Sequence, residues 1–273
     1  MQTPDPRPPY YKRPPVVERV ATLRAEMTEE EFEARYDDWR DLVQADFPVD
    51  ESLKEWLLLV EEKEGIPLLS SARPELRITP RFSLKPSKEQ FDWSIRCPVG
   101  QFTMNMHSKP GQRAGRRYQN LRADYEKWLR RWLEHFQVRK LESLSLHYVN
   151  VLNRETVPDF YKGNQFHLDR VVSVFTQVPG DHECLIPPYY SMANVKLRDH
   201  ENSILRIELE TCGKPGGEPA VKLDLVVTTV FDESAWSPEG ILGLLDWQHE
   251  RILERFEAVF TPEARKSFQP AAP

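Results

Sequence analysis

The hydrophobic pattern changes its period in the middle of the chain, between Arg116 and Asn153. Apolar residues first recur every three or four positions, which predicts one stripe of an amphipathic α-helix: Tyr118, Leu121, Tyr125, Trp128, Leu129, Trp132, Leu133 and Phe136. The period then becomes two, because one set of residues alternates with polar ones: Leu144, Leu146, Tyr148 and Leu152 against Ser143, Ser145 and His147. We expect a long helix that runs into a half-buried strand and packs across a sheet.

The N-terminal part begins with a lead that is rich in proline. Residues 1–15 contain six prolines, which deny this segment helix and sheet hydrogen bonds. Val16–Ala25 predicts a first strand. Thr28 and Glu31 form a capping box for a helix that carries apolar residues at helical spacing until Pro48: Phe32, Tyr36, Trp39 and Val43.

The next stretch, Leu53–Glu64, predicts a second helix, and a strand is the alternative. Two sets of three strands follow, one before and one after the central helix: Leu76–Leu84, Phe91–Cys97 and Val99–Met106, then Tyr189–Leu197, Ile204–Glu210 and Val221–Phe231. Pro80 predicts an edge position or a bulge. A short helix is expected at Gln165–Phe175. Ser237 and Pro238 begin a last long helix, and Thr261 begins a short one.

Strand, helix, three strands and long helix therefore occur twice. A shift of 120 residues also superimposes part of the two long helices: Arg131, Leu133, Glu134 and Phe136 on Arg251, Leu253, Glu254 and Phe256. We predict an α+β fold of two similar β-α-β-β-β-α halves, with mostly antiparallel sheets that are each covered by a long helix. The divisions are a lead (1–15), two halves packed as one unit (16–137 and 138–268) and a tail (269–273).

Composition limits the class of protein. The 273 residues are enough to bury a sizeable core, and the net charge of −6 disfavours a surface that follows nucleic acid everywhere. The three cysteines are widely spaced, which is typical of reduced thiols. The beginning of the chain lacks the apolar core of a signal peptide, and no run of 18 apolar residues occurs. We expect a cytoplasmic protein that does not bind membranes.

Several segments resemble a sporadically distributed family of uncharacterised prokaryotic proteins of about this length. The likeness covers most of the chain and lies in PPVVERVATLRA, in LSLHYVNVL after the aromatic helix, in LRIELE and KLDLVV, and in QHERILERFEAVFTPEARKSF. The family usually has Arg-Tyr-x-Asn where this chain has His147-Tyr148-Val149-Asn150. The resemblance implies no known chemistry. Its patchy distribution is typical of mobile accessory systems such as defence or toxin–antitoxin modules.

Charge is segregated along the sequence. Residues 26–64 carry 15 acids and four bases, whereas residues 109–140 carry ten bases and three acids. The two segments either neutralise each other or are solvated, or they contact partners of opposite charge. The loop before the central helix combines glycines with cations, and a bound phosphate or carboxylate would relieve their conflict with the helix dipole. The anion or nucleic-acid candidates are Lys109, Arg113, Arg116, Arg117, Lys127, Arg130 and Arg131.

A second group of candidates is polar. A cleft between the halves could gather His147, Asn150, Arg206 and Asp224 around a His–Asp base, although polar residues on a water-facing sheet have the same pattern. His182-Glu183-Cys184 matches no zinc spacing, and His249 predicts helix surface. No nucleophile, dinucleotide or phosphate-loop motif is present. We therefore assign no catalytic residue, metal or cofactor.

These patterns favour a non-enzymatic protein that binds a macromolecular partner as an adaptor or regulator. Trp247, Tyr10 and Tyr11 fall off the buried stripes and are candidate interface anchors, and we expect residues 1–13 to be dispensable for folding. The first alternative is nucleic-acid or phosphate binding along Arg113–Arg131. A third possibility is an enzyme with its site in the cleft. The sequence leaves the oligomeric state and the identity of the partner open.

Overall fold

The computed structural model describes residue 11 and residues 14–57, 60–63, 66–69, 75–83, 92–107, 118–163, 165–173, 190–212, 218–232 and 236–268. Of residues 49–57, 60–63, 66–69, 75–83, 92 and 165 it describes the backbone alone. The helices are α1 (Glu29–Gln44), α2 (Tyr118–His135), α3 (Pro238–Val259) and α4 (Pro262–Ser267), with short 3-10 helices η1 (Pro158–Phe160) and η2 (Leu168–Arg170). The strands are β1 (Val16–Ala25), β2 (Val49–Leu57), β3 (Val60–Lys63), β4 (Ile66–Leu69), β5 (Glu75–Ser83), β6 (Asp92–Arg96), β7 (Gln101–His107), β8 (Leu141–Leu152), β9 (Tyr161–Lys162), β10 (Gln165–Phe166), β11 (Tyr190–Lys196), β12 (Ser203–Thr211) and β13 (Val221–Val230).

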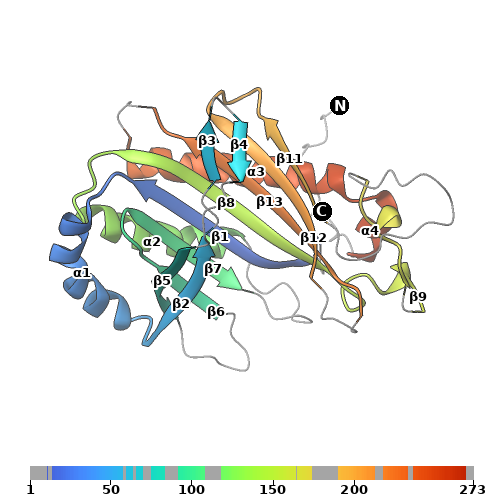
Figure 1. Ribbon diagram of the computed structural model, residues 1–273, viewed down its shortest axis with the longest axis horizontal. Helices are drawn as coiled ribbons and strands as arrows, with labels where there is room; N and C mark the ends of the chain where they lie inside the picture. The colour runs from blue at the N-terminus through green and yellow to red at the C-terminus, as the bar shows by residue number, and fades with distance from the viewer. Residues whose placement is uncertain are drawn as a thin grey trace, which may run out of the picture.

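Nine of these strands form one antiparallel sheet, in the order β11-β12-β13-β8-β1-β7-β6-β5-β2 (Figure 1). The α+β class and the antiparallel pairing are as predicted. Strand β1 of the first predicted half pairs with β8 of the second, with Val20 opposite His147. The two halves therefore share one continuous sheet rather than forming two separate ones.

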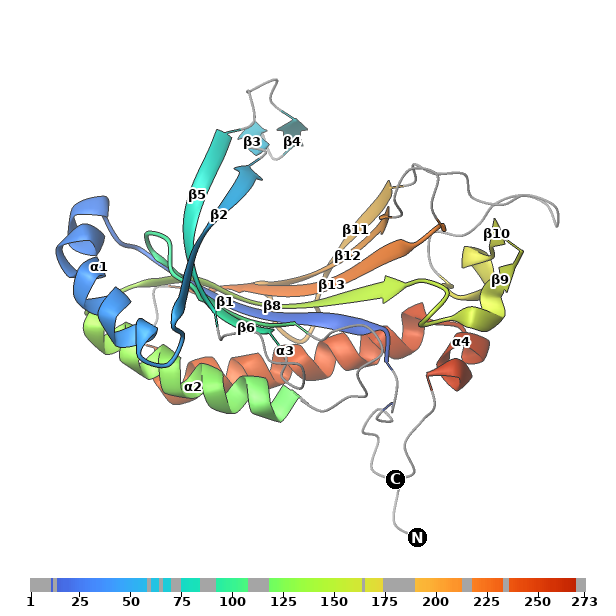
Figure 2. The same ribbon diagram turned by 90° about the horizontal axis from the view of Figure 1, so that it is seen from below.

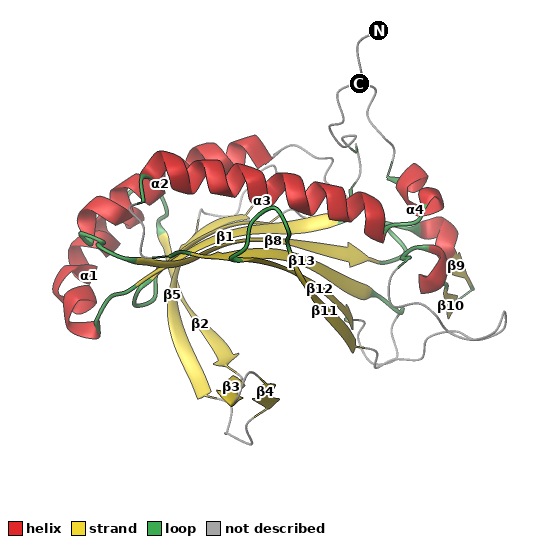
Figure 3. Cartoon of the chain, turned by 90° about the horizontal axis from the view of Figure 1, so that it is seen from above, coloured by secondary structure: helices red, strands yellow, loops and turns green. Residues whose placement is uncertain are grey.

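The long helices α2 and α3 lie side by side across one face of this sheet (Figures 2 and 3). We call the opposite face the distal face. Leu144, Leu146 and Tyr148 point toward the helices and are buried, whereas His147 points to the distal face, which confirms the predicted helix and strand. The β2–β5 hairpin bends away from the sheet on its distal side (Figure 3).

Local signals set most of the remaining elements. Helix α1 begins after Thr28, whose side chain accepts from the Glu31 N–H in the predicted capping box. Helix α3 begins after Ser237, whose hydroxyl accepts from the Gly240 N–H at 3.0 Å. The two predicted sets of strands are β5, β6 and β7 and then β11, β12 and β13, within two residues at each end.

Two predicted helices are wrong. In place of the helix at Leu53–Glu64 the structure has the alternative, strands: β2 covers residues 53–57 and β3 residues 60–63, while residues 58, 59 and 64 lie outside the described part. Strand β2 pairs with β5 from Val49 to Leu57. Apolar residues three and four apart fit a short run of either structure, and long-range pairing with β5 decides for the strand. In Gln165–Phe175, the described part forms β10 and the three residues of η2, while residues 174 and 175 lie outside the described part.

Pro80 occupies the kind of position that its ring predicts. It pairs with Ser52 of β2 on one side, and the pairing of β5 with β6 begins only at Arg81. At Pro80 the strand therefore has a hydrogen-bonded neighbour on one side, and the missing proline N–H costs no ladder bond on the other.

The core is rich in aromatic side chains where α1 meets α2. The Trp39 ring lies 6.0 Å from Trp128 and 5.7 Å from Phe136, and Phe32 stacks on Phe136 at 5.4 Å between centroids. Trp39 is fully buried. These contacts hold α1 against the end of α2 and confirm the stripe predicted for the first helix.

Two aromatic residues predicted as interface anchors contact this chain itself. The Tyr11 hydroxyl donates to Glu257 at 2.6 Å, and its ring lies 5.6 Å from Phe256. Trp247 is partly buried, and its ring lies 5.1 Å from His200. Tyr10 lies outside the described residues. We now expect the loss of residues 1–13 to lower stability, because it removes the Tyr11 contacts.

Candidate functional site

The distal face brings together two of the predicted cleft residues. His147 on β8 and Asp224 on β13 lie on neighbouring strands, and their Nε2 and Oδ1 atoms are 3.4 Å apart. The Lys222 Nζ lies 3.3 Å from the second carboxylate oxygen of Asp224 and 3.1 Å from Glu210. Burial pushes the pKa of Asp224 up, but His147 and Lys222 together lower it below its usual value. The carboxylate is therefore ionised at neutral pH.

The other two cleft candidates are not part of this pair. Arg206 lies on β12, in register with Val226 and hence two strands from His147, and its nearest acid is Glu208 at 3.6 Å. Asn150 is fully buried, and its side-chain amide donates to the Leu223 carbonyl at 3.0 Å. The four residues do not form one cleft. The His147–Asp224 pair remains as a candidate base, with its Nε2 and Oδ1 atoms buried and the rest of the imidazole partly exposed.

The basic candidates on α2 are largely engaged within the chain. Lys127 pairs with Asp46 at 2.7 Å, which joins the predicted basic and acidic segments. Arg130 lies 3.1 Å from Glu126 and 2.8 Å from Glu239. The remaining candidate, Arg131, lies 4.8 Å from the Trp128 ring centroid. Lys109, Arg113, Arg116 and Arg117 lie outside the described residues.

The prediction that His249 lies on the helix surface is wrong. Its ring stacks on Tyr118 at 3.8 Å between centroids, and its Nδ1 lies 2.8 Å from the Tyr148 hydroxyl. Tyr118 in turn donates to Asp246 at 2.7 Å. Burial first and the positive charge of Arg19 second lower the pKa of His249 to about 4, and Asp246 partly opposes them. This network fastens α2, α3 and β8 together.

The feature that the sequence did not reveal is an exposed apolar surface at one end of the sheet. Its side chains are Tyr190 and Met192 on β11, Ile204 on β12 and Val230 on β13, with exposed fractions of 58%, 47%, 48% and 55%. We call these four residues the β11–β13 surface. One local signal existed, because Ile204 falls in the polar phase of its strand, two residues before Arg206.

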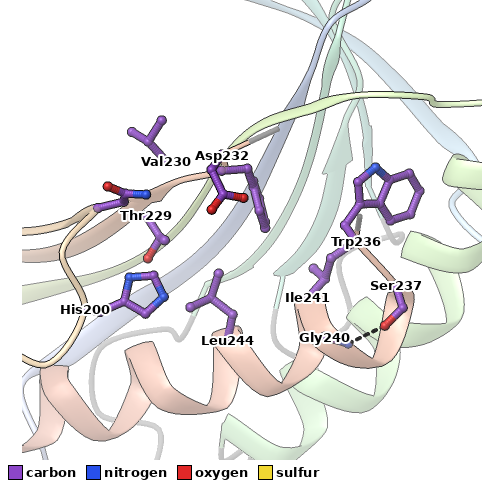
Figure 4. A pocket seen from close by; sticks show the side chains of 11 residues that line it. His200, Thr229, Val230, Asp232, Trp236, Ser237, Gly240, Ile241 and Leu244 are labelled. Atoms are coloured by element: carbon purple, nitrogen blue, oxygen red, sulfur yellow. Dashed lines mark hydrogen bonds between the residues drawn. The ribbon is translucent and has the colours of Figure 1, made fainter. Parts of the chain in front are cut away.

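Two hollows adjoin this surface. One has a volume of about 440 Å³ and is lined by Asn194, Lys196, Glu201, Asn202, Ile204 and Val230. The other, of about 310 Å³, shares Asn202 and Val230 with it and extends to the start of α3. Figure 4 shows His200 and Trp236 at opposite ends of the second hollow, with Leu244 and Ile241 between them. Ile204 and Val230 line the larger hollow, and Met192 lies two residues before its lining residue Asn194 on β11.

Other classes of site have little support in the described residues. They contain no group of three or more His, Cys, Asp or Glu side chains that could hold a metal ion. His182, Glu183 and Cys184 lie outside them. Among the helices described above, none combines the length and the apolar character needed to cross a bilayer.

No protein-family model, curated protein or solved structure matches the chain.

Proposed function

We propose that this protein binds a protein partner through the β11–β13 surface and acts as an adaptor or regulator rather than as an enzyme. One observation carries the proposal. Of the six large hydrophobic side chains that are exposed in the described part of the chain, four lie on the distal face of three consecutive strands: Tyr190, Met192, Ile204 and Val230. Of the other two, Val195 lies on the opposite face of β11, in register with Leu205, and Leu42 lies on α1. The family resemblance adds the proposal that the system is a bacterial defence or toxin–antitoxin-like one.

The physical argument is that exposed apolar area is costly unless something covers it. Apolar side chains scattered singly over a surface are ordinary, whereas a contiguous group beside shallow hollows is typical of protein interfaces. Polar and charged residues accompany the apolar ones, because Glu208 is opposite Met192 and Lys196 is opposite Ile204, while Lys196 and Glu201 line the larger hollow. A mixture of apolar and polar contacts is ordinary for a non-obligate interface.

The test is a pull-down of the tagged chain from its native host, with and without nuclease, that compares three forms. The wild type should retain a stoichiometric protein after nuclease treatment. The double variant Ile204→Glu and Val230→Glu should lose it, because two carboxylates would be buried without partners. Leu42→Glu is the matched control, since it adds a charge at an exposed apolar position on α1. Equal recovery by all three forms would contradict the proposal.

The alternative function, binding of nucleic acid or phosphate along Arg113–Arg131, stays a proposal with narrower support. Lys127 and Arg130 already contact carboxylates, so a phosphate would have to displace Asp46 or Glu239. Binding that falls steeply with salt would favour this alternative, because it reports the release of counterions. Such binding should also be lost on replacing Arg116 and Arg131 together by Glu. An apolar protein interface should change much less with salt.

The His147–Asp224 contact favours a third candidate, an enzyme that uses this pair as a base. Its support is the 3.4 Å approach of the imidazole to an ionised carboxylate on the distal face. His147→Gln and Asp224→Asn are close in shape to the native residues. If the pair is catalytic, each variant should abolish an activity of the purified protein while its thermal unfolding stays near that of the wild type.

We also propose that residues 16–137 and 138–268 descend from one duplicated unit. What supports this is the strand order. In each half the first strand pairs with the strand that precedes the long helix, β1 with β7 and β8 with β13, and the other strands follow outward in reverse order. The buried positions of the helices also match at a spacing of 120 residues, as Leu121 and Ile241 or Trp132 and Ile252 do. Comparing relatives of this chain half against half would test the idea.

A further inference from the structure

The two ends of the sheet differ in the way they treat a free strand edge. Among the described strands, β11 pairs with β12 alone and β2 with β5 alone, so each has one side without a neighbour. Strand β2, VDESLKEWL, carries four charged residues in nine. Strand β11, YSMANVK, carries one charge in seven, at its last residue, and no proline. Charges and prolines are the usual devices that keep an edge from pairing with another chain, and β11 has only the lysine at its end.

The sequence of β11 is complementary to itself when two copies run antiparallel about Ala193. Tyr190 then lies opposite Lys196 of the second copy, Met192 opposite Asn194, and Ala193 opposite Ala193. The side chains of Tyr190, Met192, Asn194 and Lys196 all lie on the distal face, because each of these residues pairs with a distal-face residue of β12. Residues directly opposite in an antiparallel pair have Cβ atoms about 5 Å apart, which brings the Lys196 ammonium within reach of the Tyr190 ring.

The larger hollow fits this arrangement. Tyr190 has an exposed fraction of 58%, and its hydroxyl lies 3.6 Å from the sulfur of Met192 on its own strand and interacts with Glu208 on β12. In the paired arrangement its ring would lie beside Asn194 and Lys196 of the second copy, which line the hollow of about 440 Å³. Each copy would thus place its Tyr190 ring at the edge of the other's hollow, as a two-fold symmetric interface requires.

We propose that the partner of the β11–β13 surface is a second copy of this chain, joined through antiparallel β11–β11 pairing about Ala193. The proposal rests on the proposed function, since it names the protein that covers the same surface. It continues the sheet from one copy into the next and leaves the helices of both copies on one side. The two features that would drive this pairing are the weakly protected edge of β11 and the contact of Tyr190 with Lys196 of the second copy.

The experiment measures the mass of the full chain in solution by light scattering or sedimentation over a range of concentrations. The wild type should move from 32.0 kDa toward twice that mass as the concentration rises. Ala193→Lys and Ala193→Glu should each stay monomeric, because like charges would face each other across the axis. Mixing the two variants should restore the dimer, because opposite charges then meet. Leu42→Lys, the control far from β11, should dimerise like the wild type.

Recovery of the dimer in the mixture would also show that neither variant is unfolded, since two unfolded chains would not form it. A wild type that is monomeric at every concentration overturns the inference. So does a dimer that both Ala193 variants keep, or a dimer that they lose and the mixture fails to restore. A monomeric wild type whose pull-down partner is still lost on Ile204→Glu and Val230→Glu would refute the dimer alone. If the wild type forms a dimer but Ile204→Glu and Val230→Glu still retain the pull-down partner, that result would instead contradict binding of a different protein at this surface.

Discussion

Acid should destabilise this protein through His249, which is held neutral in the folded state. The ring is stacked on Tyr118 and accepts or donates a hydrogen bond at Tyr148, so protonation would place a charge beside Arg19 in a partly buried site. The pKa is about 4 in the fold, against 6.5 for an unperturbed histidine. Between these values the unfolded chain binds a proton that the folded chain does not. The contribution of the neutral His249 to stability is therefore fully present above pH 6.5 and is lost as the pH falls toward 4.

The size of the effect follows from the two pKa values. At pH 5 an unfolded His249 is almost fully protonated, whereas the folded one is mostly neutral. The resulting loss in the free energy of unfolding between pH 8 and pH 5 is ~2 kcal/mol, a substantial part of the total for a domain. Replacement by Gln removes the titration and retains a polar side chain of similar reach toward the Tyr148 hydroxyl.

The assay is urea unfolding of the wild type and of His249→Gln, each at pH 8 and at pH 5. The carboxylates titrate in both proteins, so the difference between their pH dependences isolates the histidine. We expect the wild type to lose ~2 kcal/mol more than the variant on acidification. Equal losses in both proteins would show that His249 is protonated as easily in the fold as in the unfolded chain, and the argument from its packing would be refuted.

Three further changes test other contacts by the same unfolding assay at pH 8. Tyr11→Ala should lower the free energy of unfolding by ~1–2 kcal/mol, because the ring contacts and the hydrogen bond to Glu257 are lost. Deleting residues 1–13 should cost at least as much. If neither change has an effect, the lead is dispensable for folding. Gly100→Ala should cost at least ~2 kcal/mol, because φ is +64° and the new Cβ would lie 2.5 Å from the Ala25 carbonyl oxygen; a mild effect would mean that this turn relaxes. Arg122→Met should cost ~1 kcal/mol, because it removes both contacts of the guanidinium with Asp246 and leaves that carboxylate with the Tyr118 hydroxyl. Arg130→Met should change little, because its partner Glu239 is largely exposed; equal effects would contradict this difference.

The elements that sequence reasoning placed correctly have causes that lie within a few residues of each other. The Thr28 capping box, the Ser237 N-cap and the alternation of Leu205, Ile207 and Leu209 are local, and each element begins or faces as they predict. Leu53–Glu64 failed because its strand depends on β5, which follows only after the turn of the hairpin. Periodicity cannot separate helix from strand in a short run when the deciding partner is distant.

The candidate site also has one part that could be predicted from the sequence and another that could not. His147 and Asp224 could be associated from the sequence because each sits at a polar phase of a strand next to a long helix, and the sheet makes those strands neighbours. His249 was misplaced because its partners, Tyr118 and Tyr148, come from two other elements that only the packing of α2 and α3 brings together.

The β11–β13 surface could not be predicted because exposure at a sheet edge is a property of strand order. Tyr190–Lys196 carries one charge in seven residues, so its composition does not mark it as an edge strand. The order β11-β12-β13-β8 places it at the end, where its outer backbone groups have no partner strand among those described. Among the described strands β11 has one neighbour, and an edge with few charges is able to pair with another chain. The proposed β11–β11 pairing would supply the second neighbour of this strand.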